Sequence, residues 1–243
     1  MSKQCTCGRS ASYPYCDNTH LVKARVIQNI NEKTFNYLQK EYGNQVVEIN
    51  RFVSKELSFD FIKEFDDNKN WEDVAFINAK VLTEENIPHS LKEDWDKIKN
   101  SIQKSVEIIY NKKVRLQTIY IQKWEKDGEG IRHSDIRNLD GTPGNITYKI
   151  ATTLFLHKDF VGGQVKFYNK EMKIEPKHGS IYIFNGGLNE HEVLKVEDGT
   201  RYTIISFWDY EDSEYTEIEL KAMELNQEAW SKHIKEQNNN GAH

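Results

Sequence analysis

Cysteine is scarce in this chain of 243 residues: there are three, and all lie within the first 16 positions. An odd number would leave one thiol over in any set of intramolecular disulfides, so an intracellular metal site explains them better than a disulfide framework. A chain of this length also buries enough apolar surface to fold without such cross-links. We therefore expect the cysteines to form a local site, and the remaining residues to fold around a hydrophobic core.

Two further absences narrow the class of protein. No apolar run approaches the ~20 residues that a membrane helix requires, and the polar start MSKQ is not followed by an apolar signal core. Lys and Arg number 33 against 38 Asp and Glu, a net charge of −5, so the chain lacks the basic surface expected of a general nucleic-acid binder. We expect a cytoplasmic protein that contacts no membrane and for which nucleic acid is a disfavoured partner.

The spacing of apolar residues changes along the chain from helical to strand-like. Steps of three or four between residues 91 and 109 predict a long helix, and the sequence SLKE at 90–93 has the spacing of a capping box. A strand at 45–50 and a helix at 54–65 precede it. From residue 114 the period is two, in many short β-rich stretches separated by Gly, Asn and Asp turns. This order predicts an α+β fold with a β-sandwich or jelly roll packed on the preceding helices.

The same patterns predict three parts. Residues 1–24 would form a small metal-binding module, and residues 25–236 the main domain, with its β-rich core at about 114–210. The segment 217–237 has a helical pattern, and residues 237–243 form a polar tail.

The N-terminal module is predicted from four metal-binding residue types in sixteen positions. Cys5, Cys7, Cys16 and His20 have the spacing C-x-C-x8-C-x3-H, so they can converge on one metal if the chain folds tightly around it. Tetrahedral zinc accepts three cysteines and a histidine readily. Spacing alone leaves open both a structural zinc site and unliganded surface cysteines.

The stretch CTCGRSASYPYCDNTH, residues 5–20, resembles the CDGSH iron–sulfur motif in its cysteine spacing, its Ser10, its proline before the third cysteine and its final Asp and His. The resemblance implies that Cys5, Cys7, Cys16 and His20 bind a [2Fe–2S] cluster, with zinc as the alternative. The chain departs from the motif at Asn18, where the family usually has glycine; asparagine tolerates positive φ better than most residues.

A second candidate metal site lies in the β-rich half. His133 and Asp135 are two residues apart, so in an extended segment they project to the same side. With one more histidine, for which His191 is the natural candidate, they would form the two-histidine, one-carboxylate group that leaves coordination positions open on Fe(II). A second HxD sequence begins at His157, but it ends an apolar strand, and we expect it at the surface or in a loop.

The order of these residues resembles the 2-oxoglutarate and Fe(II)-dependent oxygenases of the prolyl 4-hydroxylase type, including the hypoxia-sensing prolyl hydroxylases, over roughly residues 114–210. The resemblance implies a double-stranded β-helix core. It implies that His133, Asp135 and His191 are the catalytic iron ligands, that Arg201 binds the distal carboxylate of 2-oxoglutarate, and that Thr203 adds a hydroxyl to the same carboxylate.

Other positions match the family less completely. Gly162 and Gly163 correspond to the double glycine of a family turn, and Trp124 lies near the position of a common pocket tyrosine. At Phe155 some relatives have a tyrosine whose hydroxyl reaches the 2-oxoglutarate carboxylate, which phenylalanine cannot do.

The implied function is that of a dioxygenase which consumes 2-oxoglutarate and O2, releases succinate and CO2, and hydroxylates a substrate C–H. A prolyl residue in a peptide or protein is the favoured substrate, and a free amino acid is the alternative. Fe(II) and the iron–sulfur cluster are the expected cofactors, and ascorbate is a candidate reductant. The cluster could donate electrons, sense redox state or only stabilise the N-terminus. The rival class is a non-catalytic iron–sulfur sensor or electron carrier with a partner-binding barrel.

Overall fold

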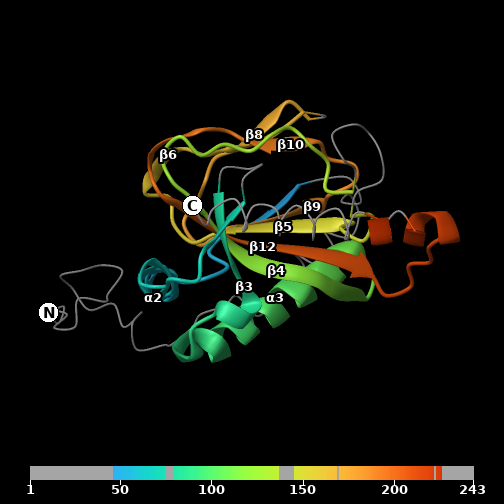
Figure 1. Cartoon of the computed structure of the whole chain (residues 1–243), viewed down its shortest axis with the longest axis horizontal. Helices are drawn as coiled ribbons and strands as arrows, with labels where there is room; N and C mark the ends of the chain where they lie inside the picture. Colours follow the sequence, from blue (N-terminus) through green and yellow to red (C-terminus); the bar gives the residue numbers. More distant parts are fainter. Residues whose placement is uncertain (1–45, 75–78, 137–144, 169, 222, 226–243) are drawn as a thin grey trace, which may run out of the picture.

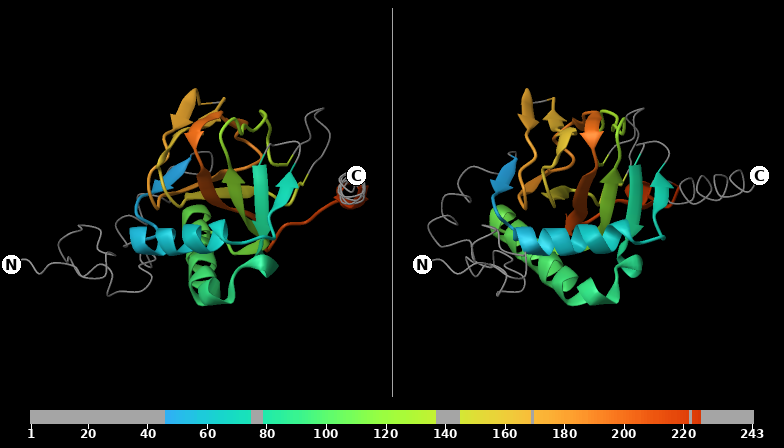
Figure 2. Two further views of the ribbon diagram at one scale, coloured as in Figure 1. Left: turned by 60° about the vertical axis from the view of Figure 1, so that its left-hand side comes forward. Right: turned by 90° about the vertical axis from the view of Figure 1, so that its left-hand side faces the viewer.

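A computed structural model of the chain describes residues 46–74, 79–136, 145–168, 170–221 and 223–225. The predicted N-terminal module, with Cys5, Cys7, Cys16 and His20, and the polar tail lie outside these residues. No helix of the described part is long and apolar enough to cross a membrane. Figures 1 and 2 show strands in two layers above helices α2 and α3.

The two helices predicted ahead of the β-rich half are present, and their apolar stripes face the core. In α2 (Lys55–Asp66) Leu57 and Phe61 are buried, and the Ser54 hydroxyl caps the N-terminus by accepting a hydrogen bond from the Leu57 amide at 3.2 Å. In α3 (Lys92–Tyr110) every apolar residue of the predicted stripe is buried. These stripes bury the apolar area that holds the two helices against the sheet.

The predicted capping box at Ser90 is wrong. A short 3-10 turn, η3 (His89–Leu91), precedes α3, and the cap position is Leu91, which makes no side-chain cap bond. Leu91 is drawn into the core, which moves the start of the helix past Ser90. The Ser90 hydroxyl instead donates a hydrogen bond to Glu64 Oε2 at 3.1 Å. A second 3-10 turn, η2 (Glu84–Asn86), lies before it.

The main sheet has seven strands in the order β1-β9-β5-β12-β4-β3-β2. The pairings between neighbouring strands are antiparallel. Their bounds are β1 (Val47–Ile49), β2 (Glu72–Val74), β3 (Ala79–Thr83), β4 (Val114–Trp124), β5 (Ile150–Phe155), β9 (Ile181–Asn185) and β12 (Arg201–Tyr210). The two longest, β4 and β12, pair from Arg201 opposite Trp124 to Tyr210 opposite Val114. The sequence predicted both within these bounds, because each is long and rich in β-branched and aromatic residues.

A smaller sheet of order β10-β7-β8 and a strand pair β11-β6 lie over the other face of the main sheet (Figure 1). Their bounds are β6 (Phe160–Gly162), β7 (Val165–Phe167), β8 (Met172–Ile174), β10 (His191–Val193) and β11 (Val196–Gly199). The separate β6 and β8, like β2 and β3, were not predicted. Strands of three to five residues carry little pattern of their own and form because of their partners.

Strand β12 separates two apolar clusters. Tyr202, Ile204 and Trp208 belong to the cluster on the helix side, while Ile205 and Phe207 face the minor sheet. This alternation follows from the two-residue period of a strand. Both faces of β12 are buried, so the polar side chains on its inner face, such as Arg201 and Thr203, stand out as candidates for function.

Candidate metal centre and cosubstrate pocket

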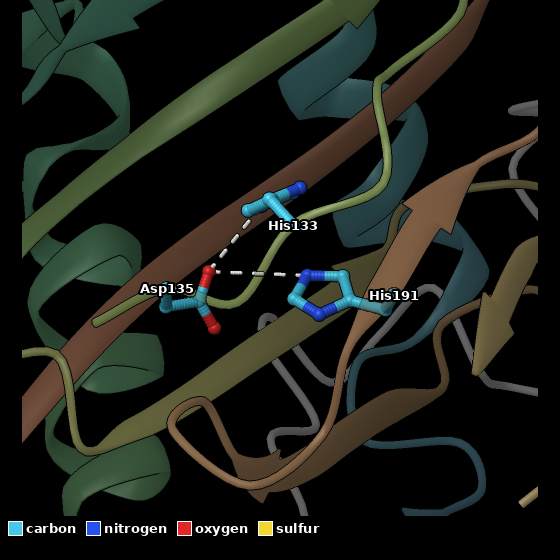
Figure 3. Close-up of side chains that lie close together, drawn as sticks. All are labelled: His133, Asp135 and His191. Carbon is cyan, nitrogen blue, oxygen red and sulfur yellow. Dashed lines mark ion pairs between the residues drawn. The ribbon is translucent and has the colours of Figure 1, made fainter. Parts of the chain in front are cut away.

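His133, Asp135 and His191 lie together at the inner side of the minor sheet (Figure 3). Asp135 Oδ1 is 3.6 Å from His133 Nε2 and 3.8 Å from His191 Nε2. One ligand atom from each residue fits within 4.8 Å of the others, so a single metal ion could contact all three. These are the three residues that the sequence indicated as candidate metal ligands. They come from two segments more than fifty positions apart, and the structure brings them together.

Backbone pairing places the two histidines side by side. His133 and His191 form an isolated antiparallel bridge in which each amide donates to the other carbonyl at 2.9 Å. The Asp135 amide donates to the Gly186 carbonyl at 3.0 Å, which turns the chain so that the carboxylate faces both rings. Alternation along the extended segment puts His133 and Asp135 on the same side, as the spacing predicted.

Carbonyl groups behind each ring fix its orientation. His133 Nδ1 lies 2.8 Å from the Ile131 carbonyl, and His191 Nδ1 lies 2.8 Å from the Asn189 carbonyl. A carbonyl oxygen only accepts, so each Nδ1 carries the proton and donates, which leaves the Nε2 lone pair facing Asp135. Such bonds to the far nitrogen are the usual way in which a protein orients metal-binding histidines.

The donor set suits a divalent cation. Asp135 Oδ2 is buried and has no hydrogen-bond partner among the described residues, and a buried carboxylate oxygen without a partner is costly unless a cation binds it. Burial lowers the pKa of His191, which favours the neutral, metal-binding form. Although burial opposes it, the Asp135 carboxylate raises the pKa of His133 above its ordinary value, so a proton would compete with a metal there.

Gly186 allows the Asp135 carboxylate to approach the chain, and sequence reasoning missed it. A Cβ atom at residue 186 would lie 2.5 Å from Asp135 Oδ2 and 2.7 Å from the Tyr148 carbonyl oxygen. Only glycine fits this space without movement of the carboxylate or the backbone. The available signal was the pair of glycines that follows the strand SIYIF at 180–184.

Arg201 lies on the inner face of β12 and is 1% exposed. Its guanidinium carbon is 4.9 Å from the centre of the Phe155 ring and 5.7 Å from that of Trp124. Nη1 donates to Thr203 Oγ1 at 3.3 Å, while Nε has no hydrogen-bond partner within the described part of the chain. Burial lowers the pKa of Arg201 to about 9, and no carboxylate among the residues that the structure describes offsets the loss of water. A buried guanidinium with one neutral partner is suited to an anion that supplies the missing bonds.

The predicted glycine turn lies beside this arginine. Gly162 and Gly163 have φ of 78° and 63°, in the left-handed region that favours glycine. A Cβ at residue 163 would be 3.0 Å from Arg201 Cδ. The centre of the Trp124 ring lies 5.7 Å from the Arg201 guanidinium carbon, and its indole Nε1 donates to Gln122 Oε1 at 3.3 Å.

His157 was expected at the surface or in a loop, and the structure has it in a loop but buried. The residue lies in the loop after β5, as expected, yet it is 8% exposed because its ring packs against Phe160 and Tyr202. Its Nδ1 accepts the Asp159 amide at 3.2 Å. The second HxD sequence therefore has a structural use, and in the described residues it joins no group of metal-binding side chains.

Two histidines and a carboxylate that one cation could contact, and a buried arginine, thus lie within one segment of the chain. Residues 118–209 match the sequence model described as the 2OG-Fe(II) oxygenase superfamily. A search of curated proteins with the sequence found no match. The segment that carries the site thus has the sequence pattern of this superfamily, for which Fe(II) and 2-oxoglutarate are expected.

Solved structures share the fold. A prolyl hydroxylase from Trichoplax adhaerens, in complex with a hypoxia-inducible factor oxygen degradation domain peptide fragment, is 18% identical with a TM-score of 0.57, over 74% of this chain and 91% of that one. HygX from Streptomyces hygroscopicus, with nickel and 2-oxoglutarate bound, is 11% identical with a TM-score of 0.58, over 76% and 89%. A prolyl-4-hydroxylase from Pseudomonas putida is 14% identical with a TM-score of 0.51, over 72% and 96%. At these identities the likeness shows the fold alone. The shared fold agrees with the predicted jelly-roll core.

Proposed function

We propose that this protein is a 2-oxoglutarate-dependent dioxygenase that hydroxylates a substrate C–H and releases succinate and CO2. One observation supports it above the others. The same barrel holds a group of two histidines and a carboxylate with a buried unpartnered oxygen, and a buried arginine with no anionic partner among the described residues. A bound cation would give the carboxylate oxygen a partner, and a bound dicarboxylate would give the arginine an anionic partner. A protein that only binds a partner would need neither ligand.

Each residue has a defined task in this proposal. His133 and His191 would hold Fe(II) through Nε2 and Asp135 through its carboxylate, and the bound iron supplies the activation of O2 that the side chains cannot. Arg201 and Thr203 would bind the distal carboxylate of 2-oxoglutarate. That ion pair would be stronger than in bulk water, because Trp124 and Phe155 exclude water from the guanidinium.

For the substrate, we propose a prolyl residue in a peptide or protein. The resemblance of the motif order and the prolyl hydroxylases among the structural neighbours support this choice. A free amino acid is the alternative. Specificity in such folds resides in loops that differ between enzymes, so a panel of both substrate classes tests the choice.

The test is formation of succinate from 2-oxoglutarate by protein purified without oxygen and supplied with Fe(II), against proline-containing peptides and free amino acids. We expect peptide-dependent succinate and a product heavier by one oxygen atom. Asp135→Ala should abolish turnover. Arg201→Gln should raise KM for 2-oxoglutarate by about 100-fold, since a charge-assisted pair is lost. No succinate with any substrate would favour the non-catalytic sensor or carrier.

For the N-terminal segment, residues 1–24, we propose that Cys5, Cys7, Cys16 and His20 bind a [2Fe–2S] cluster. The spacing and the resemblance to the CDGSH motif support this proposal. A visible absorption band that bleaches on reduction and is lost in Cys16→Ser is the expected result. Zinc in place of iron in a metal analysis would contradict it. Full multiple turnover by Cys16→Ser without ascorbate would exclude electron donation by the cluster to the oxygenase.

A further inference from the structure

Five side chains form a polar cluster on the outer face of the minor sheet, directly behind the two histidines. This outer charge cluster consists of Arg132, Lys166, Tyr168, Glu190 and Glu192. Each charged member is a sequence neighbour of an inward-facing residue: Arg132 of His133, Glu190 and Glu192 of His191, and Lys166 of Phe167. Alternation along the extended backbone sends the neighbours to opposite faces.

Backbone register explains how the cluster comes together. Strand β10 lies between β7 and the segment 130–133, with His191 opposite Phe167 on one side and opposite His133 on the other. The Gly130 amide donates to the Val193 carbonyl at 2.9 Å, one residue out of the register set by His133 and His191, so the two segments remain adjacent through a local irregularity. Arg132 therefore lies across from Glu192 and diagonal to Glu190, within reach of both carboxylates.

The contacts within the cluster are multiple. Arg132 Nε donates to Glu190 Oε2 at 2.9 Å, and Nη2 donates to the same oxygen. The guanidinium carbon lies 4.0 Å from the centre of the Tyr168 ring. Lys166 Nζ lies 4.2 Å from that ring and 3.5 Å from Glu192 Oε1. The cluster thus joins the segment that bears His133, the strand that bears His191, and β7.

This connection adds side-chain contacts to a short backbone pairing, in which His133 and His191 exchange two hydrogen bonds and the Gly130 amide donates to the Val193 carbonyl. The pairing of the His133 segment with β10 is an isolated bridge and not a strand. Isolated exposed ion pairs change an equilibrium by less than about fivefold, whereas networks with well-aligned arginine bonds reach the upper end of that range. On the inner face no described residue other than Asp135 forms an ion pair with the two histidines.

We propose that Arg132 is a positioning residue for the metal centre: through Glu190 and Tyr168 it holds the segment 131–135 against β10, so that His133 faces His191 before the metal binds. This inference rests on the proposed role of the two histidines as metal ligands. Arg132 acts through the backbone and its neighbours and does not itself touch the metal.

The direction in which one substitution changes the Kd for a divalent metal distinguishes positioning by Arg132 from a simple electrostatic effect. Arg132→Gln removes a positive charge near a cation site, so Coulomb repulsion alone predicts tighter binding of a divalent metal. Positioning predicts weaker binding, because the His133 segment loses its anchor. Glu190→Gln weakens binding on either account, so it serves as the partner in a double-mutant cycle and not as the decisive variant.

The experiment is calorimetric titration of the full chain, stripped of metal, with Mn(II), which thiolates bind poorly; binding that remains in Asp135→Ala is the background. We expect Arg132→Gln and Glu190→Gln each to raise Kd about three- to fivefold, and the double variant to raise it no further. The charge exchange Arg132→Glu with Glu190→Arg should restore Kd to within about twofold of the original. Lys112→Gln is the matched control, since Lys112 pairs with Asp212 at 2.9 Å and is 48% exposed against 54% for Arg132.

An unchanged or lower Kd in Arg132→Gln, or additive effects in the double variant, would overturn the inference. Unfolding midpoints show whether a variant is folded, and the charge exchange tests the pair even if a single variant is destabilised. If the unsubstituted chain binds no Mn(II) beyond the Asp135→Ala background, the proposed function and this inference fail together. If it binds metal and forms succinate while Arg132→Gln binds equally well, the inference alone fails.

Discussion

Replacing Gly186 by alanine should disable the metal centre while leaving the fold in place. The added Cβ would lie 2.5 Å from Asp135 Oδ2, and ordinary contacts begin at 3.4 Å, so the carboxylate or the backbone must move by the difference, about 0.9 Å. Functional constellations tolerate displacements of roughly 0.5 Å. The same Cβ would also lie 2.7 Å from the Tyr148 carbonyl oxygen, so a second close contact must be relieved as well.

We expect Kd for Mn(II) to rise about 10- to 100-fold in Gly186→Ala, the range seen when groups that orient metal ligands are lost. The cost to the free energy of unfolding should be about 1–3 kcal/mol, as for other overpacked sites. Calorimetric titration with Mn(II) gives the first quantity and urea unfolding the second.

Gly187→Ala is the matched control for Gly186→Ala. Its Cβ would meet Ile136 Cδ1 at 2.6 Å, but this atom is the end of a flexible side chain that can rotate away. We expect metal binding within about twofold of the original protein. If Gly186→Ala bound Mn(II) as tightly as Gly187→Ala does, metal binding would not require the close approach of the Asp135 carboxylate to residue 186.

Two further predictions concern the buried side chains of Phe155 and Asp209. Phe155→Tyr places a hydroxyl beside Arg201 and should lower KM for 2-oxoglutarate about threefold, measured as succinate formation; a raised KM would show that the pocket has no room for it. Asp209→Asn should cost about 1–3 kcal/mol at pH 7 in urea unfolding, because Asp209 accepts bonds from Arg115 and Tyr215. Although burial raises it, these bonds and that from the Ser213 hydroxyl hold the pKa of Asp209 below its usual range. Its contribution is therefore present above the ordinary carboxyl pKa and disappears as the pH falls through the lowered value, so the cost of Asp209→Asn should shrink as the pH is taken below the ordinary carboxyl pKa; a cost independent of pH would refute the assignment.

Local sequence patterns predicted the long helix α3, the long strands β4 and β12, and part of the site. The apolar stripe of α3 and the alternation of β4 and β12 are properties of consecutive residues, and the structure has them where the sequence predicts them. The pairs His133 with Asp135, and Arg201 with Thr203, are two apart in extended segments, so the side on which they lie together was also predictable.

Tertiary contacts decided the rest. The close approach of Gly186 to Asp135, the burial of His157 and the pairing of Arg132 with Glu190 join residues that only strand register brings together. The failed capping box at Ser90 shows the same effect on a local element, since burial of the next residue moved the helix start. The sequence by itself therefore determined which residue types line one strand face, because that depends on backbone period. Only the folded sheet decided which faces meet, because register and burial depend on contacts between segments distant in the chain.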